Sequence, residues 1–180
     1  MIKLVTINYQ LKKEQEKFKG CENLMNDKKN NRKLLPEHGV CFVCGTQNPK
    51  SIGVKWFYDD NNEIYCDVVL TEEQQGPPAH AHGGASAALL DEAMGFAAWV
   101  TGYKIVSANL NINYLKPVPL GVPLHIHAKI QSKSGKKIFA KGEIILENGD
   151  IAVEGTSILI EPNGLFKDIG PEYQEFIDNK

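Results

Sequence analysis

Two acidic residues stand in the middle of a small, apolar run. In HAHGGASAALLDEAMG, which extends from His80 to Gly95, Asp91 and Glu92 are surrounded by alanine, leucine and glycine. A buried carboxylate is unfavourable unless it is paired or hydrogen-bonded, so these two need a partner or a role. On a helix they differ by about 100° around the axis, so one can face a reaction site while the other points elsewhere. A narrow hydrated stripe that holds both carboxylates is the alternative interpretation.

Glycines precede this run, in the sequence His82-Gly83-Gly84. Glycine lets a ligand approach the backbone closely, and the first N–H groups of a helix lack internal acceptors while the helix dipole favours negative charge. The pattern therefore predicts an oxyanion hole at the start of a helix. A tight strand-to-helix turn that needs glycine only for its backbone angles is the alternative.

The spacing of the two features limits how they can work together. Gly84 and Asp91 are separated by about 10 Å along a helix axis, whereas one reacting carbonyl needs contacts of about 3 Å. If both serve one reaction, they must come from two chains whose helices lie antiparallel across a two-fold axis. The sequence therefore predicts a homodimer with two equivalent sites.

The predicted helix covers about residues 84–100 and is apolar around its whole circumference. Such a helix is buried, and in a chain with this much predicted strand it must be covered by a sheet. We therefore expect an α+β protein in which a curled antiparallel sheet is wrapped around one long central helix.

The predicted strands flank this helix. Before it, IGVKWFYDD and EIYCDVVLT are separated by turn residues and form a predicted hairpin. After it, SANLNINYLKP alternates Leu110, Ile112 and Tyr114 with asparagines, which is typical of a half-buried strand. Three further segments form a predicted antiparallel meander with turns at Ser134-Gly135 and Asn148-Gly149: PLHIHAKIQS, KKIFAKGEIILEN and DIAVEGTSILIEP.

The length of 180 residues favours one domain. Residues 11–33 mix lysines with acids and contain few large apolar side chains, so they cannot bury much surface. We expect a mobile N-terminal arm over 1–35, a folded domain over 36–162 and a C-terminal tail over 163–180, with one short helix in the tail.

The composition disfavours several classes of protein. A formal net charge of −2 leaves no large basic field for nucleic acid. No apolar run approaches the roughly 18 residues that span a bilayer, and no secretory signal is evident, so we expect a cytoplasmic protein without membrane partners. Four cysteines are too few for a disulfide framework and are expected to be reduced thiols.

Between about Cys41 and Glu161, the sequence resembles the hotdog-fold acyl-CoA thioesterases of the phenylacetate-pathway and 4-hydroxybenzoyl-CoA type. The resemblance rests on four stretches: CFVCGTQNPKSIGVKW, QQGPPAHAHGGASAALLDEAMG, NINYLKPVPLG and SKSGKKIFAKGEI. It implies a hotdog fold and hydrolysis of an acyl-CoA thioester to a free acid and CoA, without a cofactor. It also implies a site across a homodimer interface, with dimers that can pair into tetramers.

The resemblance also assigns roles. The Gly83 backbone N–H polarises the thioester carbonyl, the Asp91 of the other chain acts as general base or nucleophile, and the Ser107 hydroxyl helps to place the water. We also expect substrate contacts from Gly84, Gln75 and Glu92.

Coenzyme A phosphates are expected to meet lysines. The candidates are Lys116, beside a Pro-x-Pro bend, and Lys133 and Lys136, in a predicted hairpin turn. Lysines in such turns are usually only solvated, which is the alternative interpretation.

Two other functions remain open. His82 could be catalytic, as in the hotdog dehydratases and hydratases, although we favour its holding the turn by hydrogen bonding. A non-catalytic acyl-CoA-binding or lipid-binding protein could use the same groove. No Gly-x-Ser-x-Gly sequence is present, so an α/β-hydrolase is disfavoured.

Metal binding is the less favoured interpretation of the cysteines. Cys41-x-x-Cys44 lies close to His38, and His80-x-His82 and His125-x-His127 each pair two imidazoles. A tetrahedral zinc site needs further ligands, and no second Cys-x-x-Cys exists, so we predict no metal. His125 and His127 are expected on the outer face of a strand.

Overall fold

The computed structural model describes residues 31–162. The predicted C-terminal tail and most of the predicted N-terminal arm lie outside these residues, so both stay predictions. Lys33–Leu34 already pairs with the sheet as β1, and Leu35 is buried. Ordered pairing therefore begins a few residues before Pro36.

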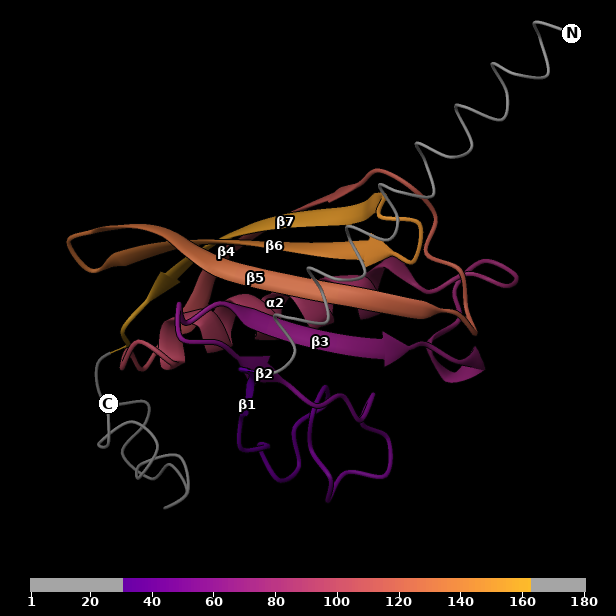
Figure 1. Ribbon diagram of the computed structural model, residues 1–180, viewed down its shortest axis with the longest axis horizontal. Helices are drawn as coiled ribbons and strands as arrows, with labels where there is room; N and C mark the ends of the chain where they lie inside the picture. Colours follow the sequence, from indigo (N-terminus) through magenta and orange to yellow (C-terminus); the bar gives the residue numbers. More distant parts are fainter. Residues whose placement is uncertain (1–30, 163–180) are drawn as a thin grey trace, which may run out of the picture. The chain divides into compact units, whose positions relative to one another are not determined.

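A seven-stranded sheet forms the larger layer, and every pair of neighbouring strands is antiparallel (Figure 1). The strand order is β1-β2-β3-β5-β6-β7-β4, so the strand that follows the helix lies at one edge. After β1, the strands are β2 (Phe57–Tyr58), β3 (Ile64–Val69), β4 (Val106–Tyr114), β5 (Pro123–Ser134), β6 (Lys137–Leu146) and β7 (Ile151–Ile160). A short 3-10 helix, η1 (Glu72–Gln74), follows β3.

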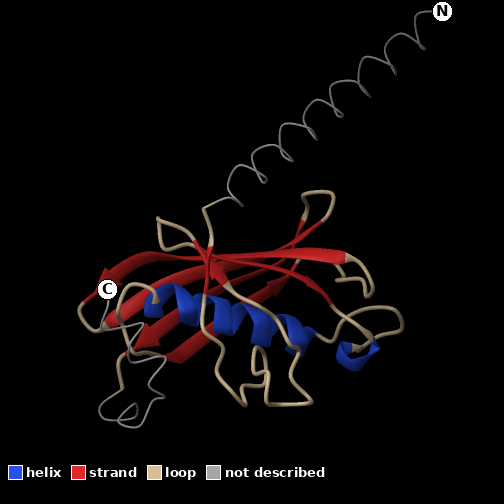
Figure 2. Ribbon diagram, turned by 60° about the horizontal axis from the view of Figure 1, so that its bottom comes forward, coloured by secondary structure: helices blue, strands red, loops and turns tan. Residues whose placement is uncertain are grey.

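The long helix α2 (Gly83–Trp99) lies against one face of this sheet (Figure 2). Its bounds agree with the predicted helix to within one residue at each end. It contacts β3, β4, β5, β6 and β7, and Leu89, Leu90 and Met94 are fully buried. One long helix packed against a large antiparallel sheet confirms the predicted hotdog fold.

Two glycines on neighbouring strands let α2 approach the sheet closely. Gly142 of β6 pairs with Gly155 of β7. A Cβ atom on Gly142 would lie 3.1 Å from a methyl group of Leu90, and one on Gly155 would lie 3.3 Å from the other methyl group. The middle of the helix, one residue before Asp91, is therefore set directly against the sheet.

The predicted strands and turns are mostly confirmed. The hairpin before the helix exists, although its first strand is only two residues long, and the meander turns contain Gly135 and Gly149 with positive φ angles of 57° and 85°. Leu110 and Ile112 of β4 pack against the core while the asparagines between them are exposed. Tyr114 shares the parity of Leu110 and Ile112, and its hydroxyl reaches the start of α2, although its side chain is 56% exposed.

The histidines of β5 face outward, as predicted. Leu124 and Ile126 are buried, whereas His125 pairs with Asp67 at 2.6 Å and His127 pairs with Glu63 at 2.7 Å. Both acids belong to or flank β3, so these histidines already have carboxylate partners. Within residues 31–162, no helix is both long and apolar enough to cross a membrane.

Candidate active site

The start of α2 presents a backbone donor without an acceptor. His82 caps the helix, and its Nδ1 accepts a hydrogen bond of 2.9 Å from the Gly84 N–H. The His82 N–H donates to the Gln74 carbonyl at 2.7 Å. Among residues 31–162, the Gly83 N–H has no hydrogen-bond acceptor, although its neighbours on both sides do. The donor needed for an oxyanion hole is therefore available at Gly83.

Tyr114 holds Gly83 from the other side. Its hydroxyl donates a hydrogen bond of 2.9 Å to the Gly83 carbonyl. A Cβ atom on Gly83 would lie 3.1 Å from both Cζ and Oη of the Tyr114 ring, so this position favours glycine. Tyr114 was not predicted as a site residue, because its place in the alternation of β4 predicted a core side chain.

Asp91 lies in the middle of α2 and faces a groove. Its carboxylate accepts a hydrogen bond of 2.5 Å from the hydroxyl of Ser107, at the start of β4. The groove has a volume of about 990 Å³, and Asp91 lines it together with Ala88, Gly95 and Ser107. The structure therefore brings together two of the predicted catalytic residues, Asp91 and Ser107.

A second hollow of about 780 Å³ lies at the start of the helix, and the predicted substrate contacts Gln75 and Gly84 line it together with His82. Phe42 lines both hollows. Gly83 and Asp91 are eight residues apart on one helix, a rise of about 12 Å, so a single chain does not bring them to one carbonyl. One chain thus presents two separate halves of the predicted site.

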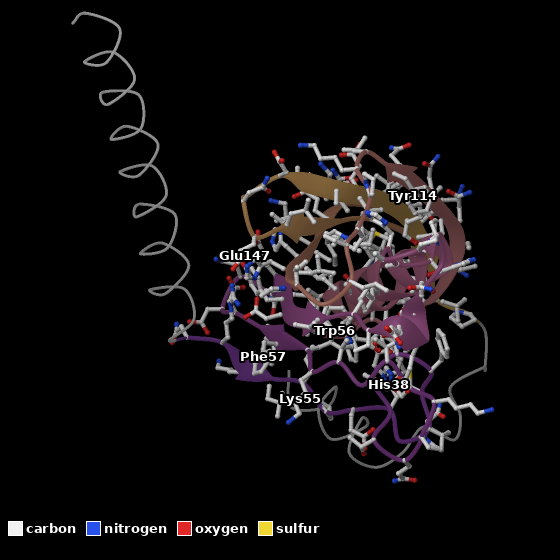
Figure 3. All side chains as sticks on the ribbon, turned by 90° about the vertical axis from the view of Figure 1, so that its right-hand side faces the viewer. His38, Lys55, Trp56, Phe57, Tyr114 and Glu147 are labelled. Carbon is white, nitrogen blue, oxygen red and sulfur yellow. The ribbon has the colours of Figure 1, made fainter. Side chains whose placement is uncertain are left out.

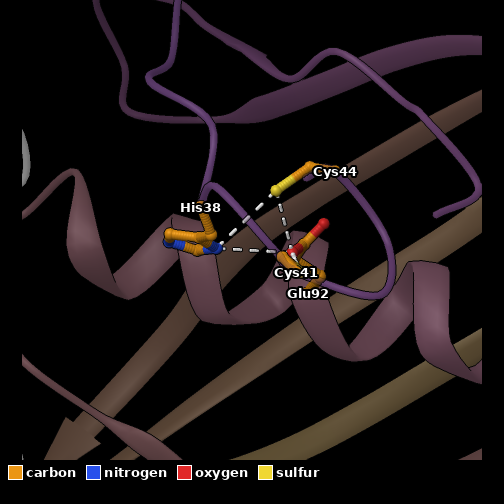
Figure 4. A group of neighbouring side chains, drawn as sticks. All are labelled: His38, Cys41, Cys44 and Glu92. Carbon is orange, nitrogen blue, oxygen red and sulfur yellow. Dashed lines mark hydrogen bonds and ion pairs between the residues drawn. The ribbon is translucent and has the colours of Figure 1, made fainter. Parts of the chain in front are cut away.

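Glu92, which lines the same groove as Asp91, contacts the segment that precedes β2. Its Oε2 accepts a hydrogen bond of 2.6 Å from Nε1 of Trp56. Its Oε1 lies 2.9 Å from Cys41 Sγ, 3.3 Å from Cys44 Sγ and 3.5 Å from His38 Nδ1 (Figure 4). The two neighbouring carboxylates therefore have different hydrogen-bond partners, although both line the groove. Figure 3 shows Trp56 and His38 well separated from Tyr114.

Burial dominates the electrostatics around Glu92. Desolvation raises the pKa of its carboxyl group, against the hydrogen bonds from His38 and Trp56. Burial also opposes a charge on His38, but hydrogen bonds with Cys41 and Glu92 raise the pKa of its imidazole to about 9. The closeness of His38 and the two cysteines in the chain was evident from the sequence, but their contact with Glu92 was not predicted.

The predicted phosphate-binding lysines line neither hollow. Lys116 forms an ion pair with Asp150 and thereby lowers the pKa of that carboxyl group. The Nζ of Lys133 lies 3.8 Å from the centre of the Tyr103 ring. Lys136 is exposed in the turn between β5 and β6. Their role in binding coenzyme A stays a prediction.

Comparison with known proteins finds similarity to thioesterases. Residues 79–153 match the family model of the thioesterase superfamily. The chain is 35% identical to the bovine (Bos taurus) acyl-coenzyme A thioesterase THEM4 over 124 residues, which cover 67% of this chain and 48% of that protein. The chain thus spans less than half the length of the curated relatives it matches.

Two solved structures share the fold. The thioesterase superfamily protein RHA08564 superposes with a TM-score of 0.65 and 33% identity, covering 67% of this chain and 60% of that one. A hypothetical thioesterase protein of Streptococcus pneumoniae TIGR4, solved with coenzyme A, gives a TM-score of 0.53 and 20% identity, covering 54% of this chain and 79% of that one.

The hydrogen bond from the Gly84 N–H to His82 allows two roles of His82 to be distinguished: a helix cap, or a catalytic acid or base. His82→Ala should lower the free energy of unfolding by about 0.5–2 kcal/mol, because the Gly84 N–H loses its acceptor. His82→Asn keeps a side-chain acceptor at the cap and should restore most of this stability. Urea denaturation of both variants measures the difference.

The turnover of the same two variants shows whether His82 also takes part in catalysis. If His82 only holds the turn, His82→Asn should also keep most of the turnover of the wild-type protein. A stable His82→Asn protein without turnover would instead assign the imidazole to the chemistry.

Proposed function

Because residues 79–153 match the family model of the thioesterase superfamily, we propose that the chain hydrolyses an acyl-CoA thioester to a free acid and coenzyme A. This proposal rests on two features of one helix, α2: a backbone donor at its start and a carboxylate in its middle. The Gly83 N–H has no acceptor among the described residues, and Asp91, held by Ser107, faces a groove. Hydrolysis of a thioester needs a donor for the developing oxyanion and a base beside a water.

In the proposed reaction, the thioester oxygen accepts a hydrogen bond from the Gly83 N–H. A water attacks the carbonyl carbon and gives its proton to the Asp91 carboxylate, while negative charge collects on the oxygen. The carbon–sulfur bond then breaks, and the coenzyme A sulfur leaves as a thiolate that takes the proton from Asp91. The Ser107 hydroxyl orients the carboxylate through its hydrogen bond to Oδ1.

The two halves of the site are proposed to meet across a homodimer. The helix separates Gly83 from Asp91 by about 12 Å, too far for one carbonyl to contact both. An antiparallel pair of α2 helices would place the Gly83 of one chain opposite the Asp91 of the other, and it would do so twice. The less buried stripe of α2 that contains Ala88, Asp91 and Gly95 gives such a pair a surface to meet on.

Coenzyme A as the carrier is supported by the relatives. The bovine relative is an acyl-coenzyme A thioesterase, and the pneumococcal thioesterase was solved with coenzyme A. The two hollows of about 990 and 780 Å³ offer room for an acyl group and for part of the carrier. Phe42, 59% exposed, lies between them and is an apolar contact for the acyl chain.

The first test of this proposal concerns the base. Asp91→Asn should lower kcat by about 10²–10⁴-fold, because the amide cannot accept the proton of the attacking water. Binding of an acyl-CoA, measured by calorimetry, should remain. Asp67→Asn is the matched control, since Asp67 pairs with His125 on the outer face of the sheet. Unchanged release of free CoA by the Asp91→Asn protein would reject this role.

A second test isolates the Gly83 N–H. Gly83 is the first residue of α2, where proline is well tolerated, and His82 has the extended backbone (φ −64°, ψ 135°) that precedes proline readily. Gly83→Pro removes the donor and should lower kcat by about 10²–10³-fold. Gly83→Ala introduces the same crowding against Tyr114 but keeps the donor. Equal kcat values for the two variants would contradict the oxyanion role.

A third test concerns the two-chain site. Asp91→Asn and Gly83→Pro homodimers each lack one half of both sites. A mixed dimer regains one intact site, from the Gly83 of the first chain and the Asp91 of the second. After equal mixing and random exchange, the turnover should rise to about one quarter of the wild-type value. If each chain contained its own complete site, mixing would give no gain over the average of the two variants.

A further inference from the structure

Four side chains with metal-binding donor atoms converge at the middle of α2, apart from the proposed oxyanion donor and base: His38, Cys41, Cys44 and Glu92 (Figure 4). Their donor atoms all lie within 4.8 Å of one another. We propose that these four side chains bind one zinc ion per chain. The ion would tie the loop that precedes β2 to the middle of the central helix.

Three of the six distances between the donor atoms fit a tetrahedral ion, and Cys41 Sγ lies within 4.8 Å of both Cys44 Sγ and His38 Nδ1. Zinc bonds of about 2.0–2.3 Å to nitrogen, oxygen and sulfur place neighbouring ligand atoms about 3.3–3.8 Å apart. Glu92 Oε1 lies 3.3 Å from Cys44 Sγ and 3.5 Å from His38 Nδ1, and the Nδ1–Sγ distance between His38 and Cys44 is 3.7 Å. The pair Glu92 Oε1 and Cys41 Sγ, at 2.9 Å, needs to separate by only about 0.5 Å.

The surroundings hold the ligands in place. Trp56 donates to Oε2 of Glu92 at 2.6 Å, which leaves Oε1 for the ion. The Val43 N–H donates to Cys41 Sγ at 3.3 Å, and the His38 ring is stacked on Phe96 with centres 4.9 Å apart. Partners of this kind orient ligands and raise the affinity of metal sites.

The loop is also shaped around the two sulfurs. A Cβ atom on Gly45 would lie 2.3 Å from the Cys41 nitrogen and 2.5 Å from the Gly39 carbonyl oxygen. No other residue fits there, so Gly45 allows the chain to turn tightly directly after Cys44. The Gly45 N–H donates to the Cys41 carbonyl at 3.1 Å and closes this turn.

The donor set favours zinc and a structural role. Two thiolates, one imidazole and one carboxylate form a set that suits zinc better than magnesium or calcium, which prefer oxygen ligands. Four protein ligands leave no open position for a substrate water. Each thiol gives its proton to solvent as the ion binds. The cation would also balance the Glu92 carboxylate, whose side chain is only 11% exposed.

The fold supplies the ligand that the sequence does not reveal. His38, Cys41 and Cys44 are close in the chain, but Glu92 follows 48 residues after Cys44. The prediction of no metal rested on the absence of a second pair of ligands, and α2 provides the fourth donor instead. This inference does not depend on the hydrolase activity.

The test is the zinc content of the purified full-length chain, by mass spectrometry of the metal after gel filtration in reducing buffer. We expect one zinc per chain, and cobalt substitution should give the absorption bands of a tetrahedral thiolate complex. Cys41→Ala, Cys44→Ala and Glu92→Gln should each lose the stoichiometric metal. Cys66→Ala is the matched control, since Cys66 is buried on β3 outside the cluster, and it should retain one zinc.

Three outcomes would overturn the proposal: a wild-type chain that binds no zinc or cobalt, a Cys41–Cys44 disulfide under the same reducing conditions, or a Cys41→Ala chain that keeps its zinc. The wild-type measurements decide the matter even if a variant fails to fold. Asp91→Asn should keep its zinc, so loss of turnover and loss of metal are measured separately.

Discussion

The burial of one straight helix against the sheet is the constraint on which the rest depends. Leu89, Leu90 and Met94 are fully buried, and the glycine pair Gly142 and Gly155 lets the helix approach the strands closely. A helix held in this way cannot bend to bring its start near its middle. The rise of about 12 Å between Gly83 and Asp91 is therefore fixed, and it argues for a site built from two chains rather than one.

The same helix positions two carboxylates for different purposes. Asp91 and Glu92 are neighbours, but the helix turns about 100° between them. Asp91 meets Ser107 in a groove, whereas Glu92 reaches Trp56, His38 and the cysteines of the preceding loop. A shift of the helix along its axis would disturb both sets of contacts together. The packing that stabilises the fold is thus also what positions the two functional groups.

Much of the fold was predictable from the sequence because it follows from periodicity. The helix was predicted to within one residue at each end, since its apolar composition differs so clearly from the alternating strands. The meander and its glycine turns were predicted for the same reason. Asp91 was singled out as a carboxylate in an apolar helix, Ser107 was predicted from the family resemblance, and the fold brings them together at 2.5 Å. The contact of Tyr114 with Gly83 was not predicted, because alternation predicts a face of a strand but not how far a side chain at its end can reach.

The contacts of Glu92 could not be predicted from the sequence, because they join parts of the chain that are far apart. A metal-binding pattern is recognised in a sequence when its ligands come in short pairs, and here the fourth donor comes from a distant helix. Its closeness to the loop depends on tertiary packing, including the stacking of His38 on Phe96 one turn further along α2. Phe42 lies between Cys41 and Cys44 in the chain and lines both hollows. The contacts that hold the Cys41 and Cys44 sulfurs against Glu92 therefore also hold Phe42 between the two hollows. The stability of this loop is thus connected with the shape of the groove.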